Sequence, residues 1–157
     1  MPVISLIFAV KEPFFVEKNR YMLNIKRFLG EEMSEKLKVL VVEDDPANLI
    51  VSVKSLERRN VEVFSAASAF EALEIYDKTR GLSAVITDIQ LPGMDGIEMM
   101  HKMRVKEELT MISVPIFAMT AYAFEEDRKH FMEQGFDDVF IKPVNYDKIL
   151  ETIQFYL

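Results

Sequence analysis

The stretch AVITDIQLPGMDG, residues 84–96, decides the fold that we predict for this chain. It begins with a short apolar run in which Val85 and Ile86 are β-branched, the pattern of a buried strand. The run ends in one carboxylate, Asp88, and the Pro and Gly residues that follow are typical of a loop. Asp88 is therefore predicted at the carboxyl end of a strand, where open α/β sheets bind ligands. Taken alone, an Asp at this position is more often a helix cap or a turn residue.

The chain has the length and composition of one globular domain with a short tail, at 157 residues and 50% hydrophobic. It holds 26 Asp and Glu against 19 Lys and Arg, and the net charge of −7 argues against non-specific binding to nucleic acid or anionic membranes. Cysteine is absent, which excludes disulfides and thiolate metal sites and fits a reducing cytoplasm. The apolar run 3–10 is too short for a membrane helix, which needs about 20 residues, and lacks the flanks of a signal peptide.

Residues 1–36 follow a different pattern and are predicted to be an N-terminal extension. Met22, Ile25, Phe28 and Leu29 recur at helical spacing among basic residues, as in an amphipathic helix. Such a helix could pack on the main domain, or it could dock a partner or a second copy. In a third interpretation the natural start is Met33 and the extension is a mis-assigned translation start, which peptides from residues 1–30 in the native protein would disprove.

From residue 37 onward, apolar strand patterns alternate with amphipathic helix patterns five times. Alternation of this kind favours a parallel sheet with helices on both faces, an α/β domain over residues 37–157. The predicted strands are 37–42, 61–64, 84–88, 114–119 and 139–141. The predicted helices run from 46 to about 58, from 68 through 76, from 95 to 106, from 125 to 134, and from 146 almost to the end. Ser68 begins the second of these helices, and Glu71 three residues later has the spacing of a capping box.

Polar residues follow four of these strands, and in a parallel sheet they converge on one edge. They are Glu43 and Asp44 after the first strand, Asp88 after the third, Thr120 after the fourth and Lys142 after the fifth. Carboxylates gathered in this way repel one another unless a cation compensates. Oxygen ligands without His or Cys indicate Mg²⁺, and a Lys suits a phosphoryl oxygen. A carboxylate nucleophile with a metal, an ammonium and a hydroxyl describes phosphoryl transfer to Asp88.

This ordered set resembles the receiver domain of two-component response regulators, and the resemblance covers residues 37–157. The residues that carry it are Glu43-Asp44, Asp88 with Pro92 and Gly96 after it, Thr120-Ala121 and Lys142-Pro143. The resemblance implies a flavodoxin-like sheet of five parallel strands in the order 2-1-3-4-5. It also implies that the bond between Lys142 and Pro143 is cis.

The resemblance assigns a role to each strand-end residue. Asp88 would be the phosphoacceptor, with Thr120 and Lys142 contacting the phosphoryl group. Mg²⁺ would be bound by Asp88, by Asp44, by Glu43 mainly through water, and by the backbone carbonyl of Gln90. Asp45 lies one position past the metal pair and is interpreted as a helix cap.

Three further positions vary within the family or depart from its common pattern. Val139 stands where many receivers carry an aromatic switch residue, and strand alternation predicts that Phe140 points to the opposite face. Gln90 and Tyr122 occupy two positions that influence phosphoryl lifetime in the family. A bulky Tyr122 is hypothesised to shield the phosphoryl group from water.

The predicted function is that of a phosphorylation switch that catalyses only its own phosphorylation and dephosphorylation. A histidine kinase or histidine phosphotransfer protein would donate the phosphoryl group, and a surface within residues 122–157 would respond. Because the sequence ends after the last helix, we expect output by partner docking or onward transfer, from a cytoplasmic monomer or weak dimer.

Alternatives from other classes have distinct requirements. A haloacid dehalogenase phosphatase needs a second Asp where Gln90 stands, and a flavodoxin needs a phosphate-binding loop where Glu43 and Asp44 would repel phosphate. A receiver-like scaffold that works without phosphorylation, and the receiver segment of a hybrid histidine kinase, both stay open.

Overall fold

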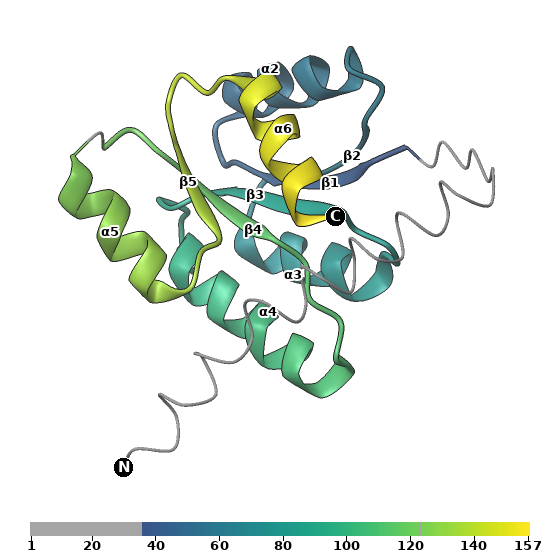
Figure 1. Ribbon diagram of the computed structural model, residues 1–157, viewed down its shortest axis with the longest axis vertical. Coiled ribbons are helices and arrows are strands. Elements are labelled where there is room, and N and C mark those ends of the chain that lie inside the picture. The colour runs from purple at the N-terminus through teal and green to yellow at the C-terminus, as the bar shows by residue number, and fades with distance from the viewer. Residues whose placement is uncertain (1–35, 123) are drawn as a thin grey trace.

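The computed structural model describes residues 36–122 and 124–157 of the chain. The predicted extension, apart from Lys36, lies outside the described residues. Strands and helices alternate through the described part (Figure 1). The strands are β1 (Lys38–Val42), β2 (Glu62–Ala66), β3 (Ala84–Asp88), β4 (Ile116–Thr120) and β5 (Asp138–Ile141). The helices are α2 (Pro46–Glu57), α3 (Ala69–Lys78), α4 (Gly96–Thr110), α5 (Glu125–Gln134) and α6 (Tyr146–Tyr156).

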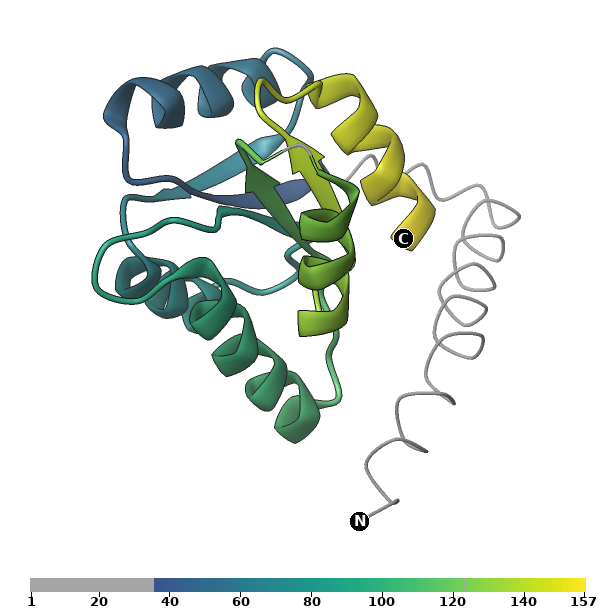
Figure 2. The ribbon, with the colours of Figure 1, turned by 90° about the vertical axis from the view of Figure 1, so that its left-hand side faces the viewer.

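The five strands form one parallel sheet in the order β2-β1-β3-β4-β5, which confirms the predicted topology. Helices α2 and α6 cover one face, while α3, α4 and α5 cover the other, so the domain has three layers (Figures 1 and 2). All carboxyl ends of the strands therefore lie along one edge. Among the described residues, no helix is both long and apolar enough to cross a membrane.

Both faces of the sheet are buried, and each strand sends alternate side chains to the two cores. On β5, Val139 packs into the core under α3, α4 and α5, whereas Phe140 packs into the core under α2 and α6. The ring of Phe140 meets Phe117 edge to face, with centroids 5.6 Å apart. The predicted opposite orientation of Phe140 is thus confirmed, and an aliphatic side chain occupies the position of the aromatic switch.

Two helix starts follow the predicted capping chemistry. The carboxylate of Asp45 accepts the Asn48 N–H at 2.8 Å and caps α2, as predicted. The hydroxyl of Ser68 accepts the Glu71 N–H at 3.2 Å and caps α3. These local bonds fix where α2 and α3 leave the sheet edge that carries the polar residues.

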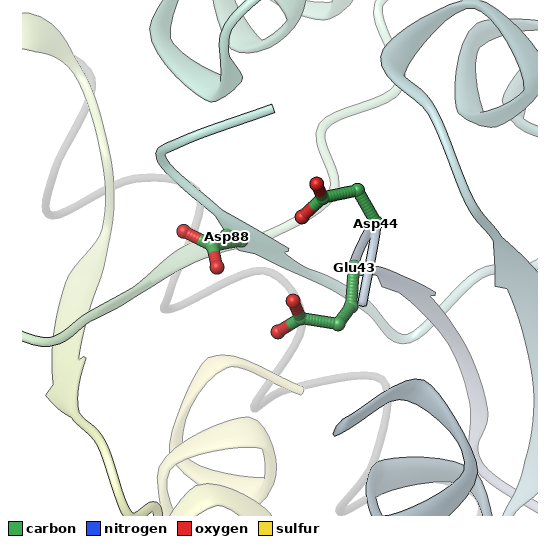
Figure 3. A group of neighbouring side chains, drawn as sticks. All are labelled: Glu43, Asp44 and Asp88. Atoms are coloured by element: carbon green, nitrogen blue, oxygen red, sulfur yellow. The ribbon is translucent and has the colours of Figure 1, made fainter. Parts of the chain in front are cut away.

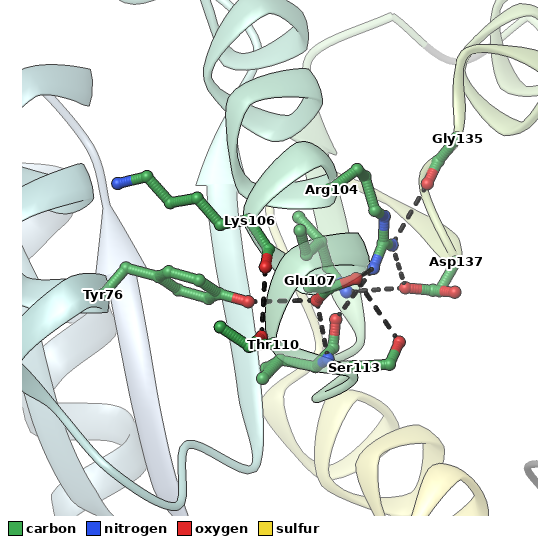
Figure 4. A network of polar contacts seen from close by, with 10 residues as sticks. Tyr76, Arg104, Lys106, Glu107, Thr110, Ser113, Gly135 and Asp137 are labelled. Carbon is green, nitrogen blue, oxygen red and sulfur yellow. Dashed lines mark hydrogen bonds and ion pairs between the residues drawn. The ribbon is translucent and has the colours of Figure 1, made fainter.

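Helix α4 continues four residues past its predicted end, and its last turns are fastened by a buried acid (Figure 4). The Glu107 carboxylate accepts bonds from the Tyr76 hydroxyl at 3.0 Å and the Val114 N–H at 2.7 Å. It also accepts from Arg104 at 2.9 Å, whose other terminal nitrogen donates to Asp137 at 2.5 Å. One guanidinium therefore ties α4 to the start of β5, and Glu107 ties it to α3 and to the segment before β4.

Candidate functional site

Three carboxylates meet at the carboxyl edge of the sheet (Figure 3). Glu43 and Asp44 follow β1, Asp88 ends β3, and one oxygen from each lies within 4.8 Å of the other two. The Glu43 side chain is 2% exposed, Asp88 is half-buried, and Asp44 is exposed. Because β1 and β3 are hydrogen-bonded neighbours, the sheet itself holds the three groups together.

Lys142 supplies the cation for this cluster. Its ammonium donates to Glu43 at 2.6 Å and also to Asp88. Burial by itself lowers the pKa of Lys142, but the bonds to Asp88 and Glu43 outweigh burial and raise the pKa above its ordinary value of 10.5. The side chain therefore carries a full positive charge at neutral pH and neutralises part of the carboxylate charge.

The backbone around Lys142 aims its side chain at the cluster. Its N–H donates to the Thr120 carbonyl at 2.7 Å, which continues the pairing of β4 and β5 past the last sheet residue. The bond to Pro143 is cis, as the resemblance implied. The site thus combines residues from β1, β3 and the end of β5.

Strand register rather than a direct bond brings Thr120 to the site. Asp88 lies opposite Met119 in the pairing of β3 with β4, so Thr120 is one residue farther along the adjacent strand. The Thr120 side chain is buried, and its hydroxyl oxygen accepts the Tyr122 N–H at 3.0 Å. Because this bond uses a lone pair of the Thr120 oxygen, the hydroxyl keeps its own proton as a donor for another acceptor.

Gln90 contacts the site through two different groups. Its N–H donates to Asp88 Oδ1 at 2.9 Å, while its side-chain amide donates to the Tyr122 hydroxyl at 3.1 Å. The two oxygens of Asp88 are therefore held by different donors, the Gln90 N–H and the Lys142 ammonium. The Gln90 carbonyl as a metal ligand stays a prediction.

Sequence reasoning missed one positioning residue, Thr87, and the physical reason for a second, Gly96. Thr87 is fully buried, and its hydroxyl donates to the Asp88 carbonyl at 2.8 Å. A Cβ added to Gly96 would lie 2.4 Å from that same carbonyl oxygen, so only glycine fits where the loop closes against β3. A polar Thr inside an otherwise apolar strand was the available signal for the first. The second depends on a close approach that sequence spacing does not reveal.

The donor set fits a hard divalent cation. All three clustered groups are carboxylates, and the exposure of Asp44 leaves room for coordinated water. Such an ion, with the Lys142 ammonium, would screen the negative charge that a phosphoryl group brings to Asp88. The arrangement is suited to phosphoryl transfer onto a carboxylate.

Comparison with known proteins decides the family. The model of the response regulator receiver domain matches residues 39–154, most of the chain. The chain belongs to the response regulator receiver family. The receiver match includes Glu43, Asp88, Thr120 and Lys142, and it agrees with the observed fold.

The similar curated proteins are of two kinds. The sensor protein GacS of Pseudomonas syringae is 29% identical over 82% of this chain, and hybrid signal transduction histidine kinase L of Dictyostelium discoideum is 37% identical over 76%. This receiver spans only 14% and 7% of those two proteins. Sporulation initiation phosphotransferase F of Bacillus subtilis is 32% identical, and the match covers 76% of this chain and 93% of that protein.

Solved receivers share the fold. The chemotaxis response regulator CheY4 of Vibrio cholerae matches with a TM-score of 0.67 at 28% identity, over 78% of this chain and 99% of that one. The receiver domain of sensor histidine kinase PA1611 from Pseudomonas aeruginosa has magnesium in its active-site cleft. It matches with a TM-score of 0.67 at 28% identity, over 77% of this chain and 97% of that one. A structure from Saccharomyces cerevisiae contains the histidine phosphotransfer protein Ypd1 in complex with the receiver domain of Ssk1. It matches with a TM-score of 0.69 at 28% identity, over 76% of this chain and 87% of that one.

Family membership places this receiver in two-component signalling. Receivers generally bind Mg²⁺ at an acidic site, and they work with histidine kinases or phosphotransfer proteins. The individual roles of Glu43, Asp44, Asp88, Thr120 and Lys142 stay predictions, as does the cytoplasmic location.

Proposed function

We propose that this receiver accepts a phosphoryl group on Asp88 from a histidine kinase or a histidine phosphotransfer protein. The observation that carries the proposal is the setting of the Asp88 carboxylate. It lies within 4.8 Å of two other carboxylates and is bonded to the Lys142 ammonium. A phosphoryl group on this carboxylate would have its negative charge stabilised by the ammonium and by a cation bound among the carboxylates.

Mg²⁺ would be held by Asp44 and Asp88, by Glu43 mainly through water, and by the Gln90 carbonyl. When bound, the ion supplies positive charge beside the transferring phosphoryl oxygens. Lys142 already binds Glu43 and Asp88 from the β5 side, so it does not need to move far to reach a phosphoryl oxygen. The solved receiver with magnesium in its cleft supports this assignment by analogy.

The reaction needs only one nucleophile from this chain. An Asp88 oxygen attacks the phosphorus of a phosphohistidine, the P–O bond forms as the P–N bond breaks, and the imidazole leaves with the electron pair. Thr120 would donate a hydrogen bond from its hydroxyl to a phosphoryl oxygen, and Lys142 would pair with the new charge. Later hydrolysis returns the carboxylate, so the domain catalyses only its own modification and is not a turnover enzyme.

Phosphorylation would replace the single negative charge of the Asp88 carboxylate by a phosphoryl group that carries about −1.5 to −2 charges. We propose that Thr120 and Lys142 convey this change to the surface within residues 122–157, which includes α5, β5 and α6. Exposed apolar side chains are present there, among them Phe124 at 75% and Phe155 at 71% exposure. Because Val139 is aliphatic, the response would rely on Thr120 and the loop after β4 instead of an inward-swinging ring.

The comparisons also support a second candidate, the receiver segment of a hybrid histidine kinase. The relatives GacS and hybrid kinase L are far longer than this chain, whereas phosphotransferase F is nearly matched in length. The chemistry at Asp88 would be the same in both cases. The genomic context of the coding sequence distinguishes the two candidates. A separate kinase gene alongside would favour the stand-alone receiver and would also identify the donor.

The test is phosphorylation by a small acyl phosphate with Mg²⁺, followed by intact-mass measurement. The expected gain is one phosphoryl group, lost in Asp88→Ala and on chelation of Mg²⁺. Asp44→Asn should slow the gain strongly, whereas the matched control Asp45→Asn, which keeps a good helix cap, should not. A chain that gains no mass despite an intact fold would instead favour the phosphorylation-independent scaffold.

A further inference from the structure

Helix α5 begins differently from the other four helices that the structure describes. Those four starts are each capped by a side chain that accepts a backbone N–H, from Asp45, Ser68, Asp95 and Asn145. The corresponding residue of α5 is Phe124, which makes no such bond and is 75% exposed. The first N–H groups of α5 therefore lack the side-chain acceptor that the other helix starts have.

The first turn of α5 also buries little. Residues 125–127 are exposed or half-buried, and Phe131 is the only buried residue among the ten of this helix. Within the described part of the chain, the side chains of residues 124–127 make no hydrogen bond or ion pair. The turn is held by its backbone, in which the Asp127 and Arg128 N–H groups both donate to the Phe124 carbonyl, at 3.1 and 3.2 Å. A turn with so few buried contacts opens locally at a low cost in free energy.

The carboxyl end of α5, in contrast, is bonded to α4. His101 Nε2 lies 3.0 Å from the Gln134 carbonyl, and this nitrogen must carry a proton because a carbonyl only accepts. Arg104 donates to the Gly135 carbonyl at 3.1 Å, and its bond to Asp137 holds the guanidinium in place (Figure 4). Two carbonyls at the end of the helix are thus satisfied by side chains of a neighbouring helix.

Two residues of α5 itself strengthen this attachment. The buried ring of Phe131 meets Phe136 edge to face, with centroids 6.4 Å apart. Arg128 donates to the Val139 carbonyl at 2.9 Å and to Asp138 at 2.7 Å, both on β5. The four residues that hold α5 from Arg128 onward, here called the carboxyl anchor, are His101, Arg104, Arg128 and Phe131.

The segment that leaves the site after Lys142 is fixed as well. It leads to Tyr146, whose hydroxyl is 2.8 Å from the hydroxyl of buried Ser52 on α2. Arg59, just after α2, donates to both carboxylate oxygens of Asp147, at 2.6 and 2.9 Å. The start of α6 is therefore tied to α2, unlike the start of α5.

Thr120 links the proposed phosphorylation site to the first turn of α5. Its hydroxyl oxygen accepts the Tyr122 N–H at 3.0 Å, and Phe124 comes two residues after Tyr122. A displacement of Thr120 toward a phosphoryl group would therefore shift the backbone that enters α5. Because the carboxyl anchor holds the rest of the helix, residues 124–127 are the part that can follow.

We propose that α5 is anchored at one end, so that the carboxyl anchor stays in place while the first turn, residues 124–127, changes conformation when Asp88 is phosphorylated. The inference rests on the proposed function, because the phosphoryl group is what draws Thr120. The two-state element is one helical turn, and the remainder of α5 does not move.

Amide hydrogen exchange in the full-length chain, read residue by residue by NMR, tests the anchoring without phosphorylation. Amides of residues 128–130 should exchange faster than those of residues 133–136, because the carbonyls that they donate to belong to residues 124–126. The matched amides of α2, residues 49–51, lie equally far from a capped helix start and should exchange more slowly than 128–130. Equal protection at both ends of α5 would refute anchoring at one end.

Two pairs of variants test the two ends separately. Phe124→Ser supplies the missing cap and should slow exchange at residues 128–130 by about 2- to 30-fold, whereas Phe124→Ala removes the same ring and should not. His101→Ala should speed exchange at residues 133–136 by about 2- to 10-fold, whereas Lys102→Ala, exposed on the same turn of α4, should not. A pair whose members behave alike would overturn the proposal for that end.

Exchange in the presence of excess acyl phosphate and Mg²⁺ tests the link to Asp88. In the phosphorylated chain the exchange rates should change at residues 128–130 and stay constant at 133–136, and Asp88→Ala should show neither the mass gain nor the change. A phosphorylated chain with unchanged rates at 128–130, or with equal changes at both ends, would refute this inference and leave the proposed function intact. A chain that gains no mass would refute the proposed function and the link to Asp88, while the unmodified chain still decides the anchoring.

Discussion

The side-chain amide of Gln90 donates a hydrogen bond to the hydroxyl of Tyr122 across 3.1 Å. Gln90 belongs to the loop after β3, and Tyr122 to the loop after β4, so the bond joins the two loops beside Asp88 and Thr120. The Gln90 N–H also holds Asp88, and the Tyr122 N–H donates to Thr120. Each partner of this bond is thus anchored on a residue of the proposed site.

The Gln90–Tyr122 pair is expected to lengthen the life of phosphorylated Asp88. Tyr122→Ala removes both the ring and the bond and should shorten the half-life most. Tyr122→Phe keeps the ring, and loss of one hydrogen bond worth about 0.5–1.5 kcal/mol corresponds to a roughly 2- to 10-fold faster loss. Decay of the phosphorylated mass after removal of the phosphodonor measures both. An unchanged half-life in Tyr122→Ala would refute shielding.

Lys142→Met should destabilise the metal-free fold, because Glu43 would stay buried without its cation. Breaking a buried pair costs about 3–5 kcal/mol, and the partial exposure of Lys142 reduces our expectation to about 1–3 kcal/mol. Urea unfolding without Mg²⁺ measures this loss, and added Mg²⁺ should reduce it. The exposed control Lys148→Met should change stability by less than about 0.5 kcal/mol.

The sign of the pH dependence follows from the raised pKa of Lys142. A basic group whose pKa is higher in the folded state stabilises fully below its unfolded value of 10.5 and loses that contribution as pH rises through the folded value. The difference in free energy of unfolding between the wild-type chain and Lys142→Met should therefore be constant near neutral pH and shrink only in strong alkali. A difference that fell between pH 6 and 8 would contradict this origin.

Gly96→Ala should destabilise the fold and disturb Asp88. The new Cβ would meet the Asp88 carbonyl oxygen at 2.4 Å, an overpacking expected to cost about 1–3 kcal/mol. In an unobstructed helix the same change would stabilise by about 0.5–1 kcal/mol, so the sign of the urea-unfolding result separates the two cases. The rate of phosphorylation should fall as well, since the strand end that carries Asp88 must shift.

Tyr76→Phe should cost about 0.5–1.5 kcal/mol by removing the bond to buried Glu107. Burial, followed by the charge and the hydrogen bond of Glu107, raises the pKa of Tyr76 above its ordinary value of 10.0. Its contribution to stability is therefore complete below pH 10.0 and lost as pH rises through the folded-state pKa. Ultraviolet titration should show a late tyrosine phase that Tyr76→Phe abolishes, and a titration without that phase would contradict the burial argument.

Some features followed from the sequence because they depend on local chemistry. The alternation of apolar strands and amphipathic helices depends on side-chain periods within one element, and it predicted the order of elements. Caps depend on residues three positions apart, so Asp45 and Ser68 were assigned without tertiary information. The predicted end of α4 fell four residues short. This helix exposes Val105 and Leu109 and buries Glu107, which is the reverse of the usual amphipathic pattern.

The sequence by itself determined which polar residues end the strands, and a parallel sheet brings those ends to one edge. Only the tertiary structure decided their partners. Lys142 reaches Glu43 across 99 positions of sequence, and Gln90 reaches Tyr122 across 32. Such bonds depend on how separate strands and loops are juxtaposed in space, which no local period encodes. The same reason hid the contact of Gly96 with the Asp88 carbonyl, since a close approach between backbones leaves no pattern of side chains.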